Sequence, residues 1–374
     1  MGDTNKITFF ASGNGDSVLL QAQGCTIMTD INYRVGSCQD ENDDDAPDFA
    51  PDIRAACPND HLDIFVLTHP DQDHLSGFGE IFHLGSPGDW TDDPEEGAVK
   101  IIVNEMWCSP YSVAPNYTTD TSKPVIDEIT RRNALRGTAE GELDGNRILV
   151  LDASSYESGT VVQGVDWRLL APTPEEANVP EPDDPDKPNS SNPTSLVIRW
   201  TITVGGKANQ ILLGGDSTLE VWERIHDEIF ENDRDALSWH ILLSPHHCSR
   251  RSIGRVENPS SANEKFIPSE KVETALSEQR GSGYVVASSN RVVRGGPTPP
   301  SFHAKNRYLR ILARGGEAGD NERARFLCTS CEKETDKPEH VVFKFSSSGP
   351  SKTLIAAPFV VTTGAASGRG GGYG

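Results

Sequence analysis

The chain has few positive charges and no long hydrophobic run. Its 374 residues include 34 Lys and Arg against 56 Asp and Glu, for a formal net charge of -22. No apolar stretch approaches the roughly 20 residues of a membrane-spanning helix, and residues 1–6 lack the basic and apolar regions of a signal peptide. We therefore expect a cytoplasmic protein with no membrane partner. Tight binding of long nucleic acid by charge is disfavoured, because it needs Lys and Arg to displace counterions.

Cysteines are also few. There are seven, an odd number, scattered along the chain. This distribution favours a reducing compartment over a disulfide framework. Cys328 and Cys331 form a single Cys-x-x-Cys pair with no second pair close by, so a coincidental spacing is favoured over a structural zinc site.

The length and the 35% hydrophobic content fit one large domain with loop insertions. We expect this domain over 1–361, insertions near 38–61, 85–98 and 172–193, and a disordered Gly-rich tail at 362–374. Acidic runs at 40–45, 92–96 and 181–186 are typical of solvated loops. These loops and the tail are the places where a protein partner could bind.

Apolar periodicity predicts a mixture of strands and helices. The expected strands lie near 6–11, 16–22, 25–30, 62–68, 99–103, 147–151, 160–163, 167–171, 195–204, 209–214, 240–244, 283–287, 325–328 and 340–346. The expected helices lie near 76–83, 123–136, 217–231, 268–278 and 301–314. This order predicts an α/β protein with two sheets and outer helices, an αββα arrangement.

Four metal-ligand residues occur within six positions directly after the apolar run 62–68. They are His69, Asp71, Asp73 and His74. Alternation at the strand end points His69 and Asp71 to one side, and the following turn lets Asp73 and His74 face a second ion. The pattern predicts a dinuclear metal site. The alternative is a solvated polar turn.

Two later strand ends carry further candidates. Asp216 follows an apolar strand and two glycines, so its carboxylate can approach a cluster and bridge two cations. The alternative for Asp216 is a helix N-cap, because a helical pattern begins at Ser217. His246 and His247 end another strand, and we favour His246 as the metal ligand, with His247 in a supporting hydrogen bond.

These segments resemble the metallo-β-lactamase fold hydrolases, whose usual signature is His-x-His-x-Asp-His. Asp71 stands where that signature has its second His, and the resulting His-x-Asp-x-Asp-His is similar to the ComEC-like branch. The resemblance also covers the turn 13–16 ending in Asp16, the strand 26–30 ending in Asp30, and the segments 192–198, 211–216 and 242–249. It spans about 6–345. It implies a four-layer αββα metallo-β-lactamase sandwich with Asp16 and Asp30 at the substrate site.

The ligand set indicates the cofactors and the chemistry. Carboxylates in place of a histidine harden the site, so we expect two divalent ions, Zn²⁺ or Mn²⁺, with Mg²⁺ also compatible. A water between two cations ionises near neutral pH and can attack a phosphodiester, with Asp73 and Asp216 as the catalytic carboxylates. No further ligand histidine is evident between 75 and 215, since His83 is better explained by packing. The second ion should therefore bind weakly.

Further candidates concern the substrate. Asn290 and His303 resemble a stretch at the site mouth of the same branch, and His303 there could protonate a leaving group. The alternative for His303 is a capping residue in the first turn of a helix. Arg250, Arg251 and Arg255 follow the histidine pair and could bind phosphate.

Together these features predict a metal-dependent phosphodiesterase or nuclease that acts on single-stranded or short nucleic acid. One alternative is hydrolysis of a small ester, lactone or thioester, because the same water-activating site serves those reactions. Another is a metal-bearing scaffold or sensor in a multiprotein bacterial system.

Overall fold

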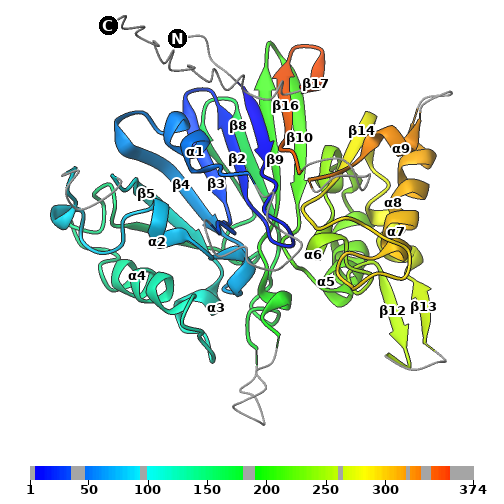
Figure 1. Cartoon of the computed structure of the whole chain (residues 1–374), viewed down its shortest axis with the longest axis horizontal. Coiled ribbons are helices and arrows are strands. Elements are labelled where there is room, and N and C mark those ends of the chain that lie inside the picture. Colours follow the sequence, from blue (N-terminus) through cyan, green and yellow to red (C-terminus); the bar gives the residue numbers. More distant parts are fainter. Residues whose placement is uncertain are drawn as a thin grey trace, which may run out of the picture.

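Two large sheets lie face to face in the computed structural model, with helices outside them (Figure 1). The structure describes residues 5–34, 47–92, 99–179, 190–259, 264–316, 321–329 and 338–353. The acidic runs at 40–45 and 181–186, the tail 362–374 and Cys331 lie outside these described residues.

The first sheet contains eight strands in the order β17-β16-β1-β2-β3-β4-β5-β6. Strands β3, β4, β5 and β6 run parallel, so the chain leaves them at one edge of the sheet. Their bounds are β1 Lys6–Phe9, β2 Val18–Ala22, β3 Cys25–Thr29, β4 His61–Leu67, β5 Ile102–Cys108, β6 Arg147–Val150, β16 Val341–Ser346 and β17 Gly349–Thr353.

The second sheet contains seven strands in the order β15-β14-β11-β10-β9-β8-β7. Strands β10, β11, β14 and β15 are parallel, so the residues that follow these strands also lie at one edge of the sheet. The bounds are β7 Ser158–Val162, β8 Val165–Ala171, β9 Val197–Val204, β10 Lys207–Leu213, β11 Trp239–Leu243, β14 Gln279–Ala287 and β15 Phe326–Cys328. A separate hairpin pairs β12 Gly254–Glu257 with β13 Lys265–Pro268.

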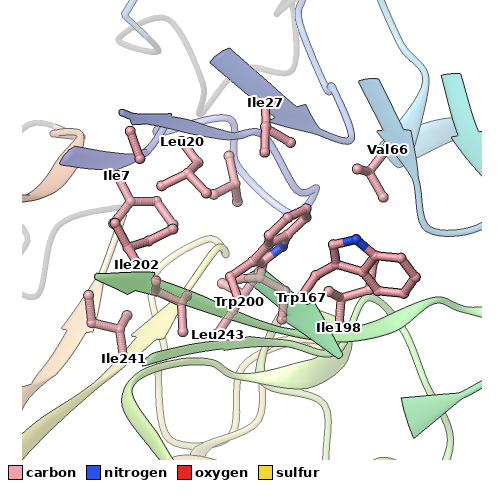
Figure 2. Close-up of a cluster of buried hydrophobic side chains, with 14 of the residues drawn as sticks. Ile7, Leu20, Ile27, Val66, Trp167, Ile198, Trp200, Ile202, Ile241 and Leu243 are labelled. Carbon is pink, nitrogen blue, oxygen red and sulfur yellow. The ribbon is translucent and has the colours of Figure 1, made fainter. Parts of the chain in front are cut away.

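A hydrophobic core fills the space between the two sheets. Figure 2 shows side chains such as Ile27 of the first sheet facing Ile198 and Trp200 of the second. The ring of Trp107 lies 5.3 Å from that of Trp167 and 5.8 Å from that of Trp200. Burial of this surface holds the sheets together, because apolar area removed from water contributes roughly 25 cal/mol per Å².

Helices cover the outer face of each sheet. Core residues of α1, α2 and α4 pack on the first sheet, and those of α5, α7 and α8 pack on the second (Figure 1). The helix bounds are α1 Ala50–Ala56, α2 Phe78–Ile81, α3 Pro110–Val113, α4 Lys123–Ala134, α5 Leu219–Arg224, α6 Pro245–Cys248, α7 Glu270–Ala275, α8 Phe302–Gly315 and α9 Glu322–Arg325. The short 3-10 segments are η1 Pro58–Asp60, η2 Gln72–His74, η3 Pro87–Asp89, η5 Asn192–Thr194 and η7 Arg234–Leu237. The predicted αββα sandwich is confirmed.

Several elements differ from the prediction. Helix α1 lies inside the segment predicted as the insertion 38–61, and its Ile53 is fully buried against the first sheet. Strand β17 and the β12–β13 hairpin were not predicted, because these strands have only four or five residues and no sustained apolar run or alternation. The single helix predicted over 217–231 is α5 continued by a π-helical turn, η6 Ile225–Phe230. Within the described ranges, no helix is long and apolar enough to cross a bilayer.

Candidate metal centre

The candidate ligands meet where the parallel strands of both sheets end. The His69–His74 loop follows β4, and Asp30 follows β3. Asp216 follows β10, and the histidine pair follows β11. Parallel strands bring their carboxyl ends to one edge, so residues far apart in sequence converge there.

Gly215 allows β10 to end close to β4. It has φ 48°, and a Cβ at this position would lie 3.0 Å from the Cβ of Thr68 and 3.2 Å from that of Ser195. The next residue, Asp216, donates its backbone N–H to Ser195 Oγ at 3.2 Å. This close approach places the Asp216 carboxylate between the ligand loops of the two sheets.

One compact cluster contains Asp73, His74, Asp216 and His247. Their nearest donor atoms all lie within 4.8 Å of one another. His247 Nε2 is 3.2 Å from Asp73 Oδ2 and 3.4 Å from Asp216 Oδ1, and His74 Nε2 is 3.3 Å from Asp216 Oδ1. Two ligands at about 2.1 Å from one tetrahedral ion stand about 3.4 Å apart, so these spacings fit a shared cation.

The other oxygen of Asp216 faces a different histidine, His246, and a further ligand pair is formed by His69 and Asp71. His246 Nε2 lies 3.5 Å from Asp216 Oδ2, and His69 Nε2 lies 3.5 Å from Asp71 Oδ2. The positive φ of His246 and His247, 51° and 50°, turns the chain so that these adjacent residues approach different Asp216 oxygens. The carboxylate therefore lies between His246 on one oxygen and His74 with His247 on the other.

The buried donor atoms at this point lack hydrogen-bond partners. They are His69 Nε2, His74 Nε2, His247 Nε2, Asp216 Oδ1 and Asp16 Oδ1. A buried polar atom left unpaired costs about 1–3 kcal/mol, so five of them converging on one site would be strongly unfavourable without a shared partner. Nitrogen and carboxylate oxygen donors together suit a divalent cation. The residues present thus fit a metal centre.

Hydrogen bonds to the other ring nitrogens fix the orientation of the histidines. His74 Nδ1 lies 2.7 Å from Asp30 Oδ2, and His247 Nδ1 lies 3.1 Å from the carbonyl oxygen of Ser288. Both acceptors favour a proton on Nδ1, which leaves the Nε2 lone pair for a metal. His69 Nδ1 contacts Thr68 Oγ1 at 3.2 Å, and that hydroxyl donates to Asp30 Oδ2 at 2.6 Å.

The pKa values reflect a strongly negative site. Burial would raise the pKa of Asp216, but the neighbouring histidines hold it well below its usual value. Burial would lower the pKa of His74 and of His247, but the surrounding carboxylates raise both well above the usual value. The pKa of Asp30 is raised, chiefly by burial. The same field of carboxylates would stabilise a divalent cation.

The loop around η5 contacts the ligands from the side. Ser191 Oγ donates to Asp71 Oδ1, and the side-chain nitrogen of Asn192 lies 3.3 Å from His246 Nδ1. Sequence reasoning gave no role to Thr68, Ser191, Asn192 or Ser288. They are common polar residues, and only the position of Thr68 and Ser288 directly after strand ends could have pointed to them.

Asp16 contacts the cluster from the turn before β2. It is buried, and its Oδ1 lies 3.5 Å from His247 Nδ1. Asp16, Asp30 and His74 also form a group with closely spaced donor atoms. The structure thus brings together Asp16, Asp30 and all the predicted ligands.

Two residues predicted at the site mouth lie in segments next to the centre. The backbone N–H of exposed Asn290 donates to Asn14 Oδ1 at 2.8 Å. His303 is in the first turn of α8, and its ring lies 5.7 Å from that of Phe266. The hydrogen bond from Ser301 N to the carbonyl oxygen of Cys248 ties this helix to the histidine turn.

The predicted arginine cluster is largely engaged by carboxylates. Arg250 pairs with Glu264, and Arg255 on β12 pairs with Glu223 at 3.1 Å. Arg251 is exposed in the turn between them. Two of these three positive charges are thus already neutralised locally.

Comparisons with known proteins show a likeness of structure and none of sequence. No protein-family profile matches the chain, and no curated protein matches it. Among solved structures, yeast PDE1 is 11% identical with a TM-score of 0.42, over 83% of this chain and 95% of that one. The metallo-β-lactamase SMB-1 is 13% identical with a TM-score of 0.32, over 64% and 78%.

The E377D mutant of CmlA β-hydroxylase is also similar in structure. It is 13% identical with a TM-score of 0.38, over 86% of this chain. The chain spans about half of that protein, 52% of its length. At these identities and scores the likenesses carry no argument about activity, which must come from the site itself.

Proposed function

We propose that this protein is a metal-dependent hydrolase that cleaves phosphodiesters with two divalent cations. The observation that supports the proposal is the position of Asp216: the unpaired, buried Nε2 atoms of His74 and His247 converge on its Oδ1, and His246 Nε2 lies 3.5 Å from its Oδ2. A carboxylate with separate ligand groups on its two oxygens has the form of a bridge between two ions.

We assign each ligand group to one ion. Asp73, His74, His247 and Asp216 Oδ1 would hold the first. The second would lie between His69, Asp71, His246 and Asp216 Oδ2. In this assignment both members of the histidine pair are ligands, whereas the sequence favoured His246 alone. Assigning both rings supplies one nitrogen ligand beyond the one that the sequence favoured.

The two groups differ in burial, and this difference supports unequal affinities. In the first group the side chains of His74, His247 and Asp73 are 0%, 1% and 33% exposed, and in the second those of His69, His246 and Asp71 are 0%, 23% and 43% exposed. Exposed ligands retain more freedom and compete with water. The second ion should therefore be the weaker one. The mixed nitrogen and oxygen donors suit Zn²⁺ or Mn²⁺.

Bound cations would supply an ionised water and neutralise the phosphate charge. In the reaction, a water oxygen bonds to phosphorus, the bond from phosphorus to one ester oxygen breaks, and the leaving alcohol takes a proton. Asp30 and Ser288 hold the histidines in the ligating tautomer, and Ser191 orients Asp71. No protein nucleophile is needed.

Charge favours a small substrate over a long polyanion. The chain carries a net charge of -22, and carboxylates pair Arg250 and Arg255. Duplex binding needs several phosphate contacts from Lys and Arg. A single phosphodiester needs little more than the cations.

The test measures metal content and hydrolysis in parallel. Wild-type protein loaded with Zn²⁺ or Mn²⁺ should bind two ions by elemental analysis and cleave bis-p-nitrophenyl phosphate. His247→Ala and His246→Ala should each lose about one ion, and Asp216→Ala should lose both ions and the activity. His226→Ala is a matched control, because His226 contacts Asp227 at 2.8 Å and Glu231 at 3.4 Å on the outer helical layer.

Unchanged metal content in Asp216→Ala would reject the metal assignment. Full metal content with cleavage of lactones or thioesters and of no phosphodiester would replace the proposed reaction with small-ester hydrolysis. Full metal content with no hydrolysis of any of these substrates would favour the scaffold or sensor function.

A further inference from the structure

A pocket opens beside the ligand loop, on the side of Asp71 and Asp73. Its volume is about 430 Å³, and its lining also includes Pro70 and Gln72 of the same loop. Ligand pockets commonly have volumes of roughly 300–1,000 Å³. A group held here would therefore lie next to the proposed reacting phosphate.

The opposite wall carries two aromatic rings. Tyr111 of α3 is buried, and Tyr117 in the loop before α4 is 45% exposed. The backbone N–H of Ala114 donates to the carbonyl oxygen of Tyr111 at 3.3 Å. Asn116 donates from its side chain to the carbonyl oxygen of Val179 at 2.7 Å. These contacts hold the loop that presents the Tyr117 ring.

Hydroxyl groups complete the lining. Thr119 and Ser122 bond to each other at the start of α4, with their side-chain oxygens 3.2 Å apart. Ser190 and Ser191 contribute from the loop around η5. The hydroxyl protons are already donated within the protein, but the oxygens of Thr119, Ser190 and Ser191 each keep a lone pair that can accept a hydrogen bond from a ligand.

The charge of the lining restricts what can enter. Its charged members are Asp71 and Asp73, and no Lys or Arg is among the described residues that form it. An anionic group would be repelled by these carboxylates. The pocket is therefore suited to a neutral group with a flat face and several polar atoms.

We propose that this pocket is a subsite for a nucleoside carried by a small phosphodiester, with its base stacked on Tyr117. The inference rests on the proposed function, because it places the substrate's phosphate at the metal centre. A nucleoside is uncharged, offers an aromatic face to Tyr117 and offers sugar and base polar atoms to the hydroxyls. Tyr117 is then a residue that determines specificity.

Two chromogenic esters test the subsite. Thymidine 5′-(p-nitrophenyl phosphate) and methyl p-nitrophenyl phosphate release the same p-nitrophenolate, so they differ only in the group that the pocket would hold. Stacking of a base on an aromatic side chain corresponds to roughly 5- to 150-fold in affinity. Tyr117→Ala should therefore raise KM for the thymidine ester by at least about fivefold and leave the methyl ester unchanged.

Conservative and distant variants control for loss of structure. Tyr117→Phe keeps the ring and should retain the preference for thymidine. Leu143→Ala removes a side chain that is 59% exposed and outside the pocket lining, and should change neither ester. Equal use of both esters by wild type, with no effect of Tyr117→Ala, would overturn the subsite and leave phosphodiester cleavage intact.

Direct binding of thymidine separates the two proposals. If wild-type protein hydrolyses neither ester, the proposed reaction fails, and calorimetric binding of thymidine still tests the pocket. Binding that Tyr117→Ala weakens and Tyr117→Phe preserves would support the subsite. Absence of thymidine binding to wild type, or equal binding to wild type and Tyr117→Ala, would overturn it.

Discussion

Asn in place of Asp30 should weaken metal binding without unfolding the protein. Asp30 is fully buried behind the proposed ligands and accepts three hydrogen bonds. Its Oδ1 accepts from Thr68 N at 2.8 Å, and its Oδ2 accepts from Thr68 Oγ1 at 2.6 Å and binds His74 Nδ1 at 2.7 Å. Asp30→Asn keeps the shape and can keep the Oδ1 bond. It puts an NH₂ group where Oδ2 was.

This NH₂ group would face the Nδ1–H of His74. The conflict is relieved when His74 shifts its proton to Nε2, but that nitrogen then has no lone pair for a metal. Loss of such a supporting partner typically costs 10- to 100-fold in metal affinity, which is about 1.4–2.7 kcal/mol. Burial raises the pKa of Asp30, so the charged carboxylate is costly to bury. The NH₂ group also faces the hydroxyl of Thr68, and the buried pair with His74 is lost, so the substitution should cost about 1–3 kcal/mol of metal-free stability.

Asp63 offers a matched control on the neighbouring strand. Its Oδ2 accepts from Thr26 N at 2.8 Å and from Thr26 Oγ1 at 2.9 Å, the same pair of bonds that Asp30 accepts from Thr68. Competition with a chromophoric chelator would measure Zn²⁺ affinity, and urea unfolding in the metal-free state would measure stability. If Asp30→Asn keeps wild-type affinity, or if Asp63→Asn weakens binding equally, the role of Asp30 is wrong.

Two further predictions concern stability away from the site. The side chain of Glu128 is 2% exposed and pairs with that of Arg132, which is equally buried. Glu128→Gln should therefore lower the free energy of unfolding in urea at pH 7 by about 3–5 kcal/mol. The control Asp127→Asn, on the exposed face of α4, should lower it by about 0.5 kcal/mol or less. Burial would raise the pKa of Glu128, but Arg131 and Arg132 hold it below the usual value. Its stabilisation should therefore be present above about pH 4.3 and be lost as pH falls through the lowered pKa, and a wild-type pH profile identical to that of Glu128→Gln would refute this. Trp200→Ala, in the core between the sheets, should cost about 3–5 kcal/mol by the same measurement, and a cost under 1 kcal/mol would show that the sheets repack.

Most strands of the sandwich could be predicted because each carries an apolar or alternating run bounded by polar turn residues. The strand near 62–68 and the motif after it are an example, since β4 places His69 at its end. Helix α1 was missed because its seven residues offer only Ala50, Ile53 and Ala56 to the core, within a polar stretch. Strand β17 has little apolar signal of its own and is defined by its pairing with β16. Such elements depend on neighbours that one sequence does not reveal.

The ligand motif at His69–His74 could not predict the pocket beside the metal centre. Its lining comes from the ligand loop, α3, the loop before α4 and the loop around η5. Tyr111 and Tyr117 have no spacing relation to His69, and serine and threonine are frequent on any surface. The relation between these segments exists only in three dimensions.

The alternation of side chains along a strand could not decide between His246 and His247 as the metal ligand. Strand geometry predicts that adjacent residues point to opposite faces, so one ring should be a ligand and the other should not. In the structure the chain has left β11, and His246, His247 and Cys248 all have positive φ, 51°, 50° and 63°. Left-handed residues other than glycine cost roughly 1–2 kcal/mol each, so three in succession need a compensating interaction. A cation held by these histidines would supply it, so the backbone conformation of this turn agrees with the proposed metal centre.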